Sequence, residues 1–419
     1  MVALVDGGAI TVGLEQAGFE VDEHLLIGEN SLEANTRHLP HNRPNIKYTP
    51  PSIWEDETLS YLRDGIPRDL QHTFVIPACS GLSAVNPHAS ADAAQNVHFY
   101  RGFKILEEVR PLTWTLENAP TLIDKGFPIL RDMVRRLGHI YKFTIVSDAA
   151  GRHGVAMRRA RTMVFGWRRD VFGDTIPIVD PTGEKQPTIR DVFGDLPEDI
   201  RQTNVPDHNV LVKFSLCDEL PEAMEEAIKN RMNFNNALHS LWKRDPSVLD
   251  RVPERDRKWV TRIIEKIENK TLKWNKAATP LYWDGIAPSM TSMTLLIHPS
   301  GKRPCTVREM ARLMGFPDDF TFLPDEPRGT HIVQCLAQEV PAPFVKWAAT
   351  QSRLALEDPS GIKKLGAGPD TVVYQDNKSG KYASFTAEEF CALEAVKIGV
   401  LGVEKIKKIP VDVGSTIDF

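Results

Sequence analysis

A short apolar run that breaks into a cysteine-bearing loop, at residues 73–83, constrains the fold of this chain more than any other stretch. Residues 74–76 are apolar and bounded by Pro77, a pattern typical of a parallel strand that is covered on both faces. Cys79 follows that strand, at the edge where open α/β sheets gather ligands and reacting groups. A lone cysteine is more often a small core side chain, so a reactive role for Cys79 depends on partners elsewhere.

Composition excludes several classes of protein. The 419 residues are 42% hydrophobic and 26% charged, as in a soluble globular chain with room for about two to three domains. No apolar run is long enough for a membrane span, and no signal peptide is predicted. The five cysteines are widely spaced and odd in number, which argues against a disulfide framework or a Cys-x-x-Cys metal site and favours a reducing, cytoplasmic setting. A net charge of -5 neither indicates nor excludes nucleic-acid binding.

The amino-terminal part alternates predicted strands and helices. A strand at residues 2–5 is followed by a turn of Asp6, Gly7 and Gly8 and then by a helix. Such a helix amino terminus suits a nucleotide-like or carboxylate-bearing ligand. Glu29 follows the next predicted strand, where a carboxylate can bind ribose hydroxyls. A simple tight turn and a solvated glutamate are alternatives that these residues leave open.

A second carboxylate lies beyond another predicted strand. Residues 112–116 form the strand pattern, which ends at Glu117, and Pro120 favours a tight loop there over a helix start. Because the carboxyl ends of parallel strands share one sheet edge, Cys79 and Glu117 are expected to meet above it.

Two arginines belong to the same part of the predicted sheet. Strands are predicted at residues 141–146 and 162–167, and Arg159 and Arg161 alternate along the start of the second. Side chains two residues apart on a strand share a face, so this pair projects together, whereas Arg158 points away.

Several segments, in this order along the chain, carry a family resemblance. They are residues 13–19, Glu29, 77–79, 117–120, 154–161 and 303–320. Together they resemble the DNA (cytosine-5-)-methyltransferase family over most of residues 1–350, with unrelated sequence in the middle. The resemblance implies a divergent member with an α/β fold: a Rossmann-like S-adenosylmethionine-dependent methyltransferase sheet, an inserted target-recognition domain and a small α+β C-terminal extension. Restriction-modification and phage protection both stay open as its biological setting.

The resemblance also implies a reaction, the transfer of a methyl group from S-adenosyl-L-methionine to carbon 5 of cytosine in DNA. Cys79 would add to carbon 6 of a flipped-out base and turn the ring into an enamine. Glu117 would hold or protonate the ring nitrogen beside the exocyclic amine. Asn118 would position that loop. Arg159 and Arg161 would contact the base carbonyl and steady the catalytic loop.

Ligand contacts are implied in the same way. Cofactor contacts would come from Leu4, Asp6, Gly7, Gly8, Glu29, Pro77, Gln338 and Val340. Ser83 would contact double-stranded DNA; no metal or membrane is expected, and a monomer is favoured. The chain departs from the family pattern at Leu4 and Asp6, where an aromatic residue is lost and a carboxylate is added, so an altered cofactor affinity or identity stays open. Further departures are Ala78, Met157, Ala337, Gln338, and Ser52 with Asp56 where an acid is usual.

The middle of the chain holds a basic segment. Residues 243–276 contain eleven Lys or Arg against six Asp or Glu. Apolar residues recur there at helical spacing, namely Trp259, Val260, Ile263, Ile264 and Ile267. The outward-facing positions include four cations, namely Arg255, Arg262, Lys266 and Lys270. Solvated helix surface is one interpretation; within a methyltransferase-like chain we favour contact with DNA phosphates, and the bases that are read stay open.

Four regions are predicted: a catalytic and cofactor-binding domain at 1–168, a target-recognition domain at 169–285, a return to the catalytic domain at 286–356, and an extension at 357–419. The extension reads as a hairpin, with strands at 371–374 and 382–385, followed by a helix at 386–401. Docking on the core and self-association are both open for it. Two other functions also stay open, an RNA cytosine-5 methyltransferase and a non-catalytic DNA-binding relative.

Overall fold

The computed structural model describes the chain in several ranges. These are residues 2–3, 8–21, 23–26, 38, 40–49, 70–83, 86–180, 183–201, 203–212, 215–272, 278–291, 294–322, 329–358, 364–366 and 370–408. Within these ranges all five cysteines are free thiols. None of the helices there has the length and apolar character needed to cross a bilayer. The same ranges hold no group of three or more His, Cys, Asp or Glu side chains arranged for a metal ion.

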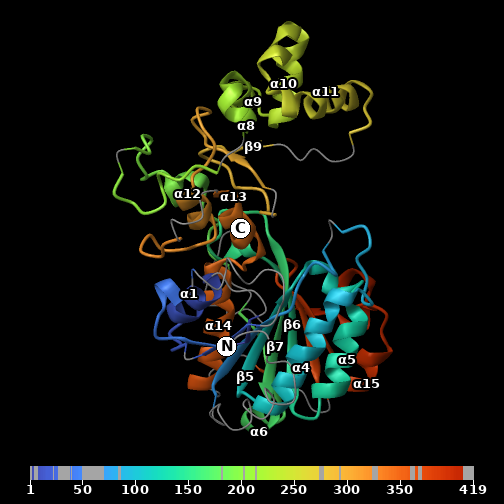
Figure 1. Ribbon diagram of the computed structural model, residues 1–419. Helices are drawn as coiled ribbons and strands as arrows, with labels where there is room; N and C mark the ends of the chain where they lie inside the picture. Colours follow the sequence, from blue (N-terminus) through green and yellow to red (C-terminus); the bar gives the residue numbers. More distant parts are fainter. Residues whose placement is uncertain are drawn as a thin grey trace.

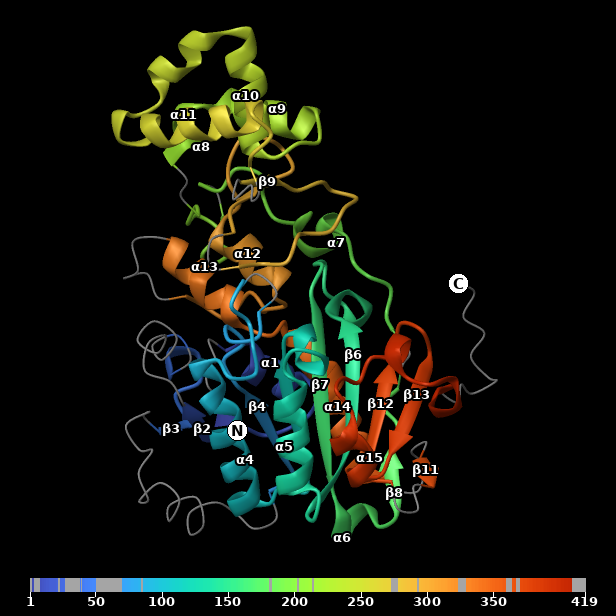
Figure 2. The same ribbon diagram turned by 90° about the vertical axis from the view of Figure 1, so that its right-hand side faces the viewer.

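A ten-stranded mixed sheet forms the centre of the molecule (Figures 1 and 2). Its strand order is β14-β13-β12-β6-β7-β5-β4-β1-β2-β3. The bounds are β1 Val2–Ala3, β2 Glu23–Leu26, β3 Lys47–Thr49, β4 His72–Ile76, β5 Thr113–Asn118, β6 Tyr141–Ala149, β7 Ala160–Arg168, β12 Val372–Asp376, β13 Lys381–Phe385 and β14 Lys407–Lys408. Strands β1 to β5 pair in parallel, and β7 runs antiparallel between β5 and β6. The predicted α/β, Rossmann-like fold class is confirmed.

The apolar run of β4 is buried on both faces, as its sequence predicts. Phe74 and Ile76 pack in one hydrophobic cluster, together with helices α1 (Ala9–Gln16) and α14 (Ala342–Glu357). Val75, between them, packs in a second cluster, formed by α4 (Val97–Val109), α5 (Phe127–Leu137) and α15 (Ala387–Ala392). Because alternate residues of a strand point to opposite faces, a continuous apolar run is what a sheet between two helical layers requires.

The last long helix folds back beside the first. Gly13 of α1 lies so close to α14 that an added Cβ atom would be 2.5 Å from Cβ of Val345 and 2.7 Å from the carbonyl oxygen of Ala342. Residues of α14 thereby complete the core around the start of the sheet.

Helices between β7 and the return segment form a separate hydrophobic cluster above the sheet in Figure 1. They are α8 (Ser215–Glu219), α9 (Pro221–Lys229), α10 (Phe234–Arg244) and α11 (Glu254–Glu268), and α7 (Ile189–Phe193) precedes them. Val260 and Ile264 of α11 are buried, but Trp259 is 41% exposed, so the apolar stripe of this helix is narrower than predicted. After these helices the chain returns to the segment between β6 and β7, where Ala287 donates its amide hydrogen to the carbonyl of Ala156 at 2.8 Å.

The C-terminal strands belong to the main sheet. The predicted hairpin is confirmed, with β12 antiparallel to β13, and β12 also pairs in parallel with β6. The predicted helix at 386–401 is wrong in extent. Thr386 caps α15 as expected, but the helix ends at Ala392. Beyond it, the amide of Val396 donates to the carbonyl oxygen of Ile123, a contact that a continued helix would not allow. A short strand before the hairpin, β11 (Lys364–Gly366), pairs with β8 (Thr175–Pro177).

Candidate active site

Cys79 lies just past β4, in a tightly folded and partly exposed loop. Its carbonyl oxygen accepts from the amide of Leu82 at 3.0 Å. Gly81 packs against Asn96, since an added Cβ atom would overlap Oδ1 of that residue. The Asn96 amide donates to the carbonyl oxygens of Ser90 and Ala91, at 2.8 and 2.9 Å. These bonds hold residues 90–91 in a turn, and α4 begins after it, at Val97.

Two side-chain hydrogen bonds connect the end of β5 and the residues after it to the cysteine loop. Nδ2 of Asn118 donates to the carbonyl oxygen of Pro77 at 3.0 Å, and Asn118 Oδ1 accepts from the amide of Ala119 at 2.9 Å. Oγ1 of Thr121 donates to the carbonyl oxygen of Leu82. Asn118 was predicted to position this region. The role of Thr121 was not predicted from the sequence. Its partner is a main-chain carbonyl, and every residue type has one, so no residue pattern indicates the bond.

Glu117 and Arg161 form a buried ion pair across β5 and β7, with 2.5 Å between Oε1 and Nε. The two side chains are only 4% and 14% exposed. Burial raises the pKa of Glu117 above its ordinary value, while the charges of Arg161 and Arg159 act in the opposite direction. A carboxyl group in this position retains a proton more readily than one in water.

Arg159 lies beside this pair and is almost completely buried. Its Nη2 donates to the carbonyl oxygens of Ala337 and Glu339, at 3.1 and 2.6 Å. Its Nε has no hydrogen-bond partner among the described residues. Burial and the neighbouring Arg161 lower the pKa of Arg159, and the charges of Glu117 and Cys79 oppose that effect. The structure therefore brings Cys79, Glu117 and both arginines together, with Arg158 exposed as predicted.

The predicted cofactor residues lie partly outside the described residues. Leu4, Asp6, Gly7 and Glu29 are among those not described. Of the others, Pro77 is buried and accepts from Asn118, Val340 is buried, and Gln338 is exposed at the end of α13 (Gly329–Gln338).

Gly8 lies at the start of α1 with a φ angle of 119°. The adjacent parallel strands β1, β2 and β4 bring their carboxyl ends to this helix start. An added Cβ atom on Gly8 would overlap the ring of Phe320. A helix amino terminus at the carboxyl edge of parallel strands fits an adenosine-containing cofactor.

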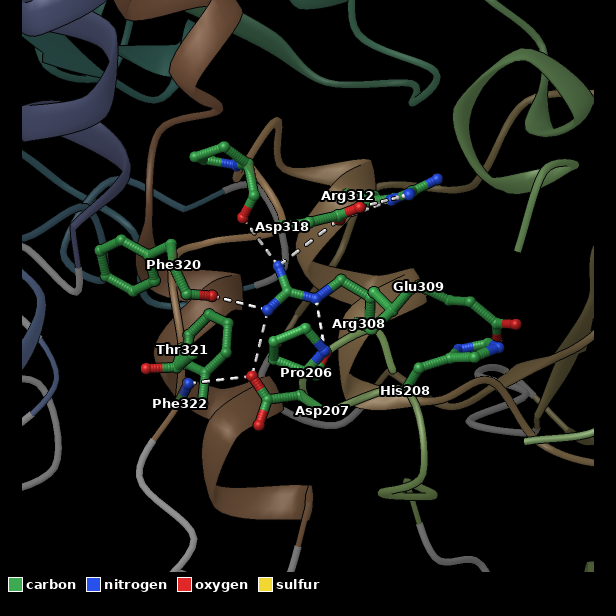
Figure 3. Close-up of polar contacts among 12 residues, drawn as sticks. Pro206, Asp207, His208, Arg308, Glu309, Arg312, Asp318, Phe320, Thr321 and Phe322 are labelled. Atoms are coloured by element: carbon green, nitrogen blue, oxygen red, sulfur yellow. Dashed lines mark hydrogen bonds and ion pairs between the residues drawn. The ribbon is translucent and has the colours of Figure 1, made fainter. Parts of the chain in front are cut away.

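A buried arginine holds the Phe320 segment in place (Figure 3). Arg308 lies in α12 (Val307–Leu313), which begins with a capping box formed by Thr306 and Glu309. Its guanidinium donates to the carbonyl oxygens of Pro206 at 2.9 Å, Pro317 at 2.8 Å and Phe320 at 2.6 Å, and to Oδ2 of Asp207 at 3.1 Å. Sequence reasoning gave Arg308 no role. Arg308 thereby joins residues 206–207, which precede α8, to the turn whose Phe320 ring lies against Gly8.

The predicted DNA-contacting residues lie in two places. Ser83 is in the cysteine loop and partly exposed. Arg255 and Arg262 are exposed on α11, Lys266 is partly exposed there, and Lys270 is exposed just beyond its end. Both views place α11 well away from the sheet (Figures 1 and 2), so the structure does not bring these cations to Cys79.

Comparison with known proteins gives a family match over most of the chain. The model of the C-5 cytosine-specific DNA methylases matches residues 6–352. The type II methyltransferase M1.HphI of Haemophilus parahaemolyticus is 22% identical over 329 residues, which cover 75% of this chain and 77% of the relative. The type II methyltransferase M.XorII of Xanthomonas oryzae pv. oryzae is 24% identical over 385 residues, 86% of each chain.

Solved structures share the fold. A prophage-encoded protein of E. coli, assigned as a DNA modification methyltransferase, matches with a TM-score of 0.56 at 17% identity, over 85% of this chain and 98% of its own. The S. pombe Dnmt2 methyltransferase matches with a TM-score of 0.51 at 13% identity, over 86% of this chain and 99% of its own. At such low identity these structures support the architecture of the sheet and its helices.

Proposed function

Because the chain belongs to the C-5 cytosine-specific DNA methylase family, whose methyl donor is S-adenosyl-L-methionine, we propose that it methylates carbon 5 of cytosine in DNA through a covalent cysteine adduct. The observation that carries this proposal is the cluster of Cys79, Glu117, Arg159 and Arg161 at the carboxyl edge of the sheet. A protein that only bound DNA would have no physical need for a thiol beside a buried, arginine-paired carboxyl group.

Cys79 is the proposed nucleophile. Its thiolate forms a bond to carbon 6 of the cytosine ring, and the electron pair of the C5–C6 double bond moves through carbon 4 toward the ring nitrogen N3. The ring thereby becomes an enamine whose carbon 5 is nucleophilic. S-adenosylmethionine supplies the electrophilic methyl group. Water then takes the proton from carbon 5, and the electron pair of that C–H bond re-forms the C5–C6 double bond and expels the Cys79 thiolate. The proton on N3 returns to Glu117, which restores the aromatic ring.

Glu117 is the proposed proton donor to N3. Its raised pKa suits this role, because a carboxyl group whose pKa is raised takes up a proton more readily than one in water and can pass it to the ring as negative charge develops there. Arg161 orients the carboxyl group through their ion pair at 2.5 Å. Arg159, held by main-chain carbonyls and with its Nε unpartnered among the described residues, would bind the carbonyl oxygen of the base.

Access to this cluster requires the base to leave the helix. Carbon 6 of a stacked and paired cytosine is out of reach of a cysteine in a sheet-edge loop, so we propose base flipping from double-stranded DNA. Arg255, Arg262, Lys266 and Lys270 would contact phosphates and so position the duplex without reading its sequence. The five free thiols agree with a cytoplasmic setting.

Expression in a host that lacks its own cytosine-5 methyltransferases tests the proposal. The host DNA should acquire 5-methyldeoxycytidine, measured by nucleoside mass spectrometry after digestion. Parallel analysis of the RNA fraction tests the alternative that the protein methylates cytosine in RNA. A heavier deoxycytidine adduct would indicate a modified cofactor. A protein that binds DNA yet leaves both polymers unmodified would have to be assigned as a DNA-binding relative.

A further inference from the structure

The strands that close one side of the sheet lie outside the family match. The match ends at residue 352, whereas the first of these strands, β12, begins at Val372, and β13 and β14 follow it. Strand β12 pairs with β6 over five residue pairs, from Val372 opposite Phe143 to Asp376 opposite Ser147. The C-terminal segment, residues 370–408, therefore extends the sheet that carries the proposed active site.

A buried polar network joins this segment to the end of β6. Asn377, the first residue after β12, is buried and donates from Nδ2 to Oδ2 of Asp148 at 2.8 Å. The same oxygen accepts from Nε2 of His153 at 2.8 Å, and Oδ1 accepts from the amide of Ala149 at 2.7 Å. Gln375 supports the arrangement by donating to Oδ1 of Asn377 at 3.0 Å. The Asp148 carboxylate itself has no exposed surface.

Asp148 lies directly opposite Arg161 in the antiparallel pairing of β6 with β7. The turn after it carries His153, whose ring stacks on Trp347 of α14 with 4.0 Å between centroids. The far limb of this turn carries Arg159, whose carbonyl oxygen accepts from the amide of Ala150 at 2.7 Å. The hydrogen bond of Asn377 therefore fixes the β6 side of this turn, and the β7 side of the same turn carries Arg159 and Arg161.

The same C-terminal segment also contacts the loop that follows Glu117. The amide of Val396 donates to the carbonyl oxygen of Ile123 at 3.1 Å, and Nζ of Lys397 pairs with Asp124. Phe390 packs against Phe127 with 5.0 Å between ring centroids. One segment thus contacts both the loop after Glu117 and the turn between β6 and β7.

We infer that residues 370–408 are a positioning element of the active site and that Asn377 is its positioning residue, acting on Arg159 and Arg161 through Asp148. This inference rests on the proposed function, because its kinetic consequence is measured as methyl transfer. Asn377 touches neither base nor cofactor. Its effect is to hold the arginine pair in line with Glu117 and Cys79.

The test is the Asn377→Asp variant, which keeps the size of the side chain but places a second carboxylate against Asp148. Methyl transfer to unmethylated genomic DNA should show kcat reduced about tenfold or more, with KM for DNA unchanged. Amide hydrogen exchange of residues 150–161 should become faster while exchange in α8–α11 stays as in the wild type. That second measurement needs no activity, so it tests the inference even if the wild-type protein fails to methylate DNA.

A pH profile separates positioning from general loss of stability. Two carboxylates that share a site hold a proton between them at low pH, and the protonated new group can then donate to Asp148 as Asn377 does. The kcat ratio of wild type to variant should therefore shrink as the pH falls. The charged and titratable groups that face Asp148 are Arg152 and His153, and both are present in the wild type and in the variant.

Asp376→Asn is the matched control, because Asp376 occupies the same turn but bonds to the exposed Ser379. It should keep wild-type kcat and wild-type exchange at residues 150–161. The inference is overturned if Asn377→Asp leaves both kcat and that exchange unchanged. It is equally overturned if the control variant reproduces the defect.

Discussion

Asn118 and Pro77 are joined by a hydrogen bond of 3.0 Å from the side-chain amide to the main-chain carbonyl. This contact ties the strand that ends at Glu117 to the loop that begins before Cys79. The proposed nucleophile and the proposed proton donor therefore have a fixed relation before any substrate binds, which is the condition under which a second reactive group accelerates a covalent step.

Replacement of Cys79 by alanine should abolish methyl transfer and leave DNA affinity nearly unchanged, because the thiolate forms a bond that only catalysis uses. A duplex with 5-fluorocytosine at the target should trap the wild-type protein as a covalent adduct, since fluorine cannot leave as a proton does. Gel mobility under denaturing conditions detects the adduct. Cys391→Ala, at another partly buried free thiol, serves as the control and should still be trapped. Residual turnover by Cys79→Ala would refute the assignment of the nucleophile.

Glu117 should make stability depend on pH. A carboxyl group with a raised folded-state pKa contributes stability that is present below its ordinary pKa, about 4.3, and is lost as the pH rises through the raised value. Glu117→Gln should remove this dependence of stability on pH. The free energy of unfolding of the wild type should therefore fall relative to that of the variant as the pH rises from the ordinary pKa of Glu through the raised one. Denaturant titrations at several pH values measure the difference. A constant difference at all pH values would contradict the raised pKa.

Gly8 should tolerate no side chain. Its φ of 119° is unfavourable for other residues, and the Phe320 ring occupies the space of a Cβ atom. Gly8→Ala should destabilise the fold by about 1–3 kcal/mol and weaken binding of S-adenosylmethionine, measured by thermal unfolding and calorimetry. Adding Phe320→Ala should relieve the steric part of the binding defect but not the backbone strain. Full cofactor affinity in Gly8→Ala alone would show that this turn is not part of the cofactor site.

The cations of α11 should set the salt dependence of DNA binding. Changing Arg255, Arg262, Lys266 and Lys270 to glutamine should weaken binding to all sequences and reduce the salt slope by about 0.9 for each phosphate that the variant no longer neutralises. Fluorescence anisotropy at several salt concentrations measures the slope. The control neutralises four exposed cations of the C-terminal hairpin region, Lys378, Lys381, Lys407 and Lys408, and should keep the wild-type slope. An unchanged slope in the α11 variant would identify that helix face as solvated surface.

The sequence predicted the central part of the fold because hydrophobic pattern and strand position determine it. The apolar run before Cys79 predicted a doubly covered strand, and the two-residue spacing of Arg159 and Arg161 predicted a shared face. Side chains that end neighbouring strands meet at one edge whatever their distance along the chain. That rule brought Glu117 to the same edge as Cys79.

Contacts to main-chain carbonyls could not be predicted in the same way. The hydrogen bond of Thr121 to Leu82, and those of Arg159 to Ala337 and Glu339, depend on where the chain returns in space. The helix predicted at 386–401 fails for a related reason. Helical propensity is a local property, and the pairing of Val396 with Ile123 overrides it.

Strands β12, β13 and β14 also determine which strand forms this edge of the sheet. Without them the nine-residue β6 would be an open edge, with its unpaired amides and carbonyls available to another chain. In the protein the last described strand on this side is β14, which is two residues long and consists of Lys407 and Lys408. A short, positively charged edge is a poor template for strand addition. A chain cut before residue 370 would therefore show aggregation through β6 as its first defect.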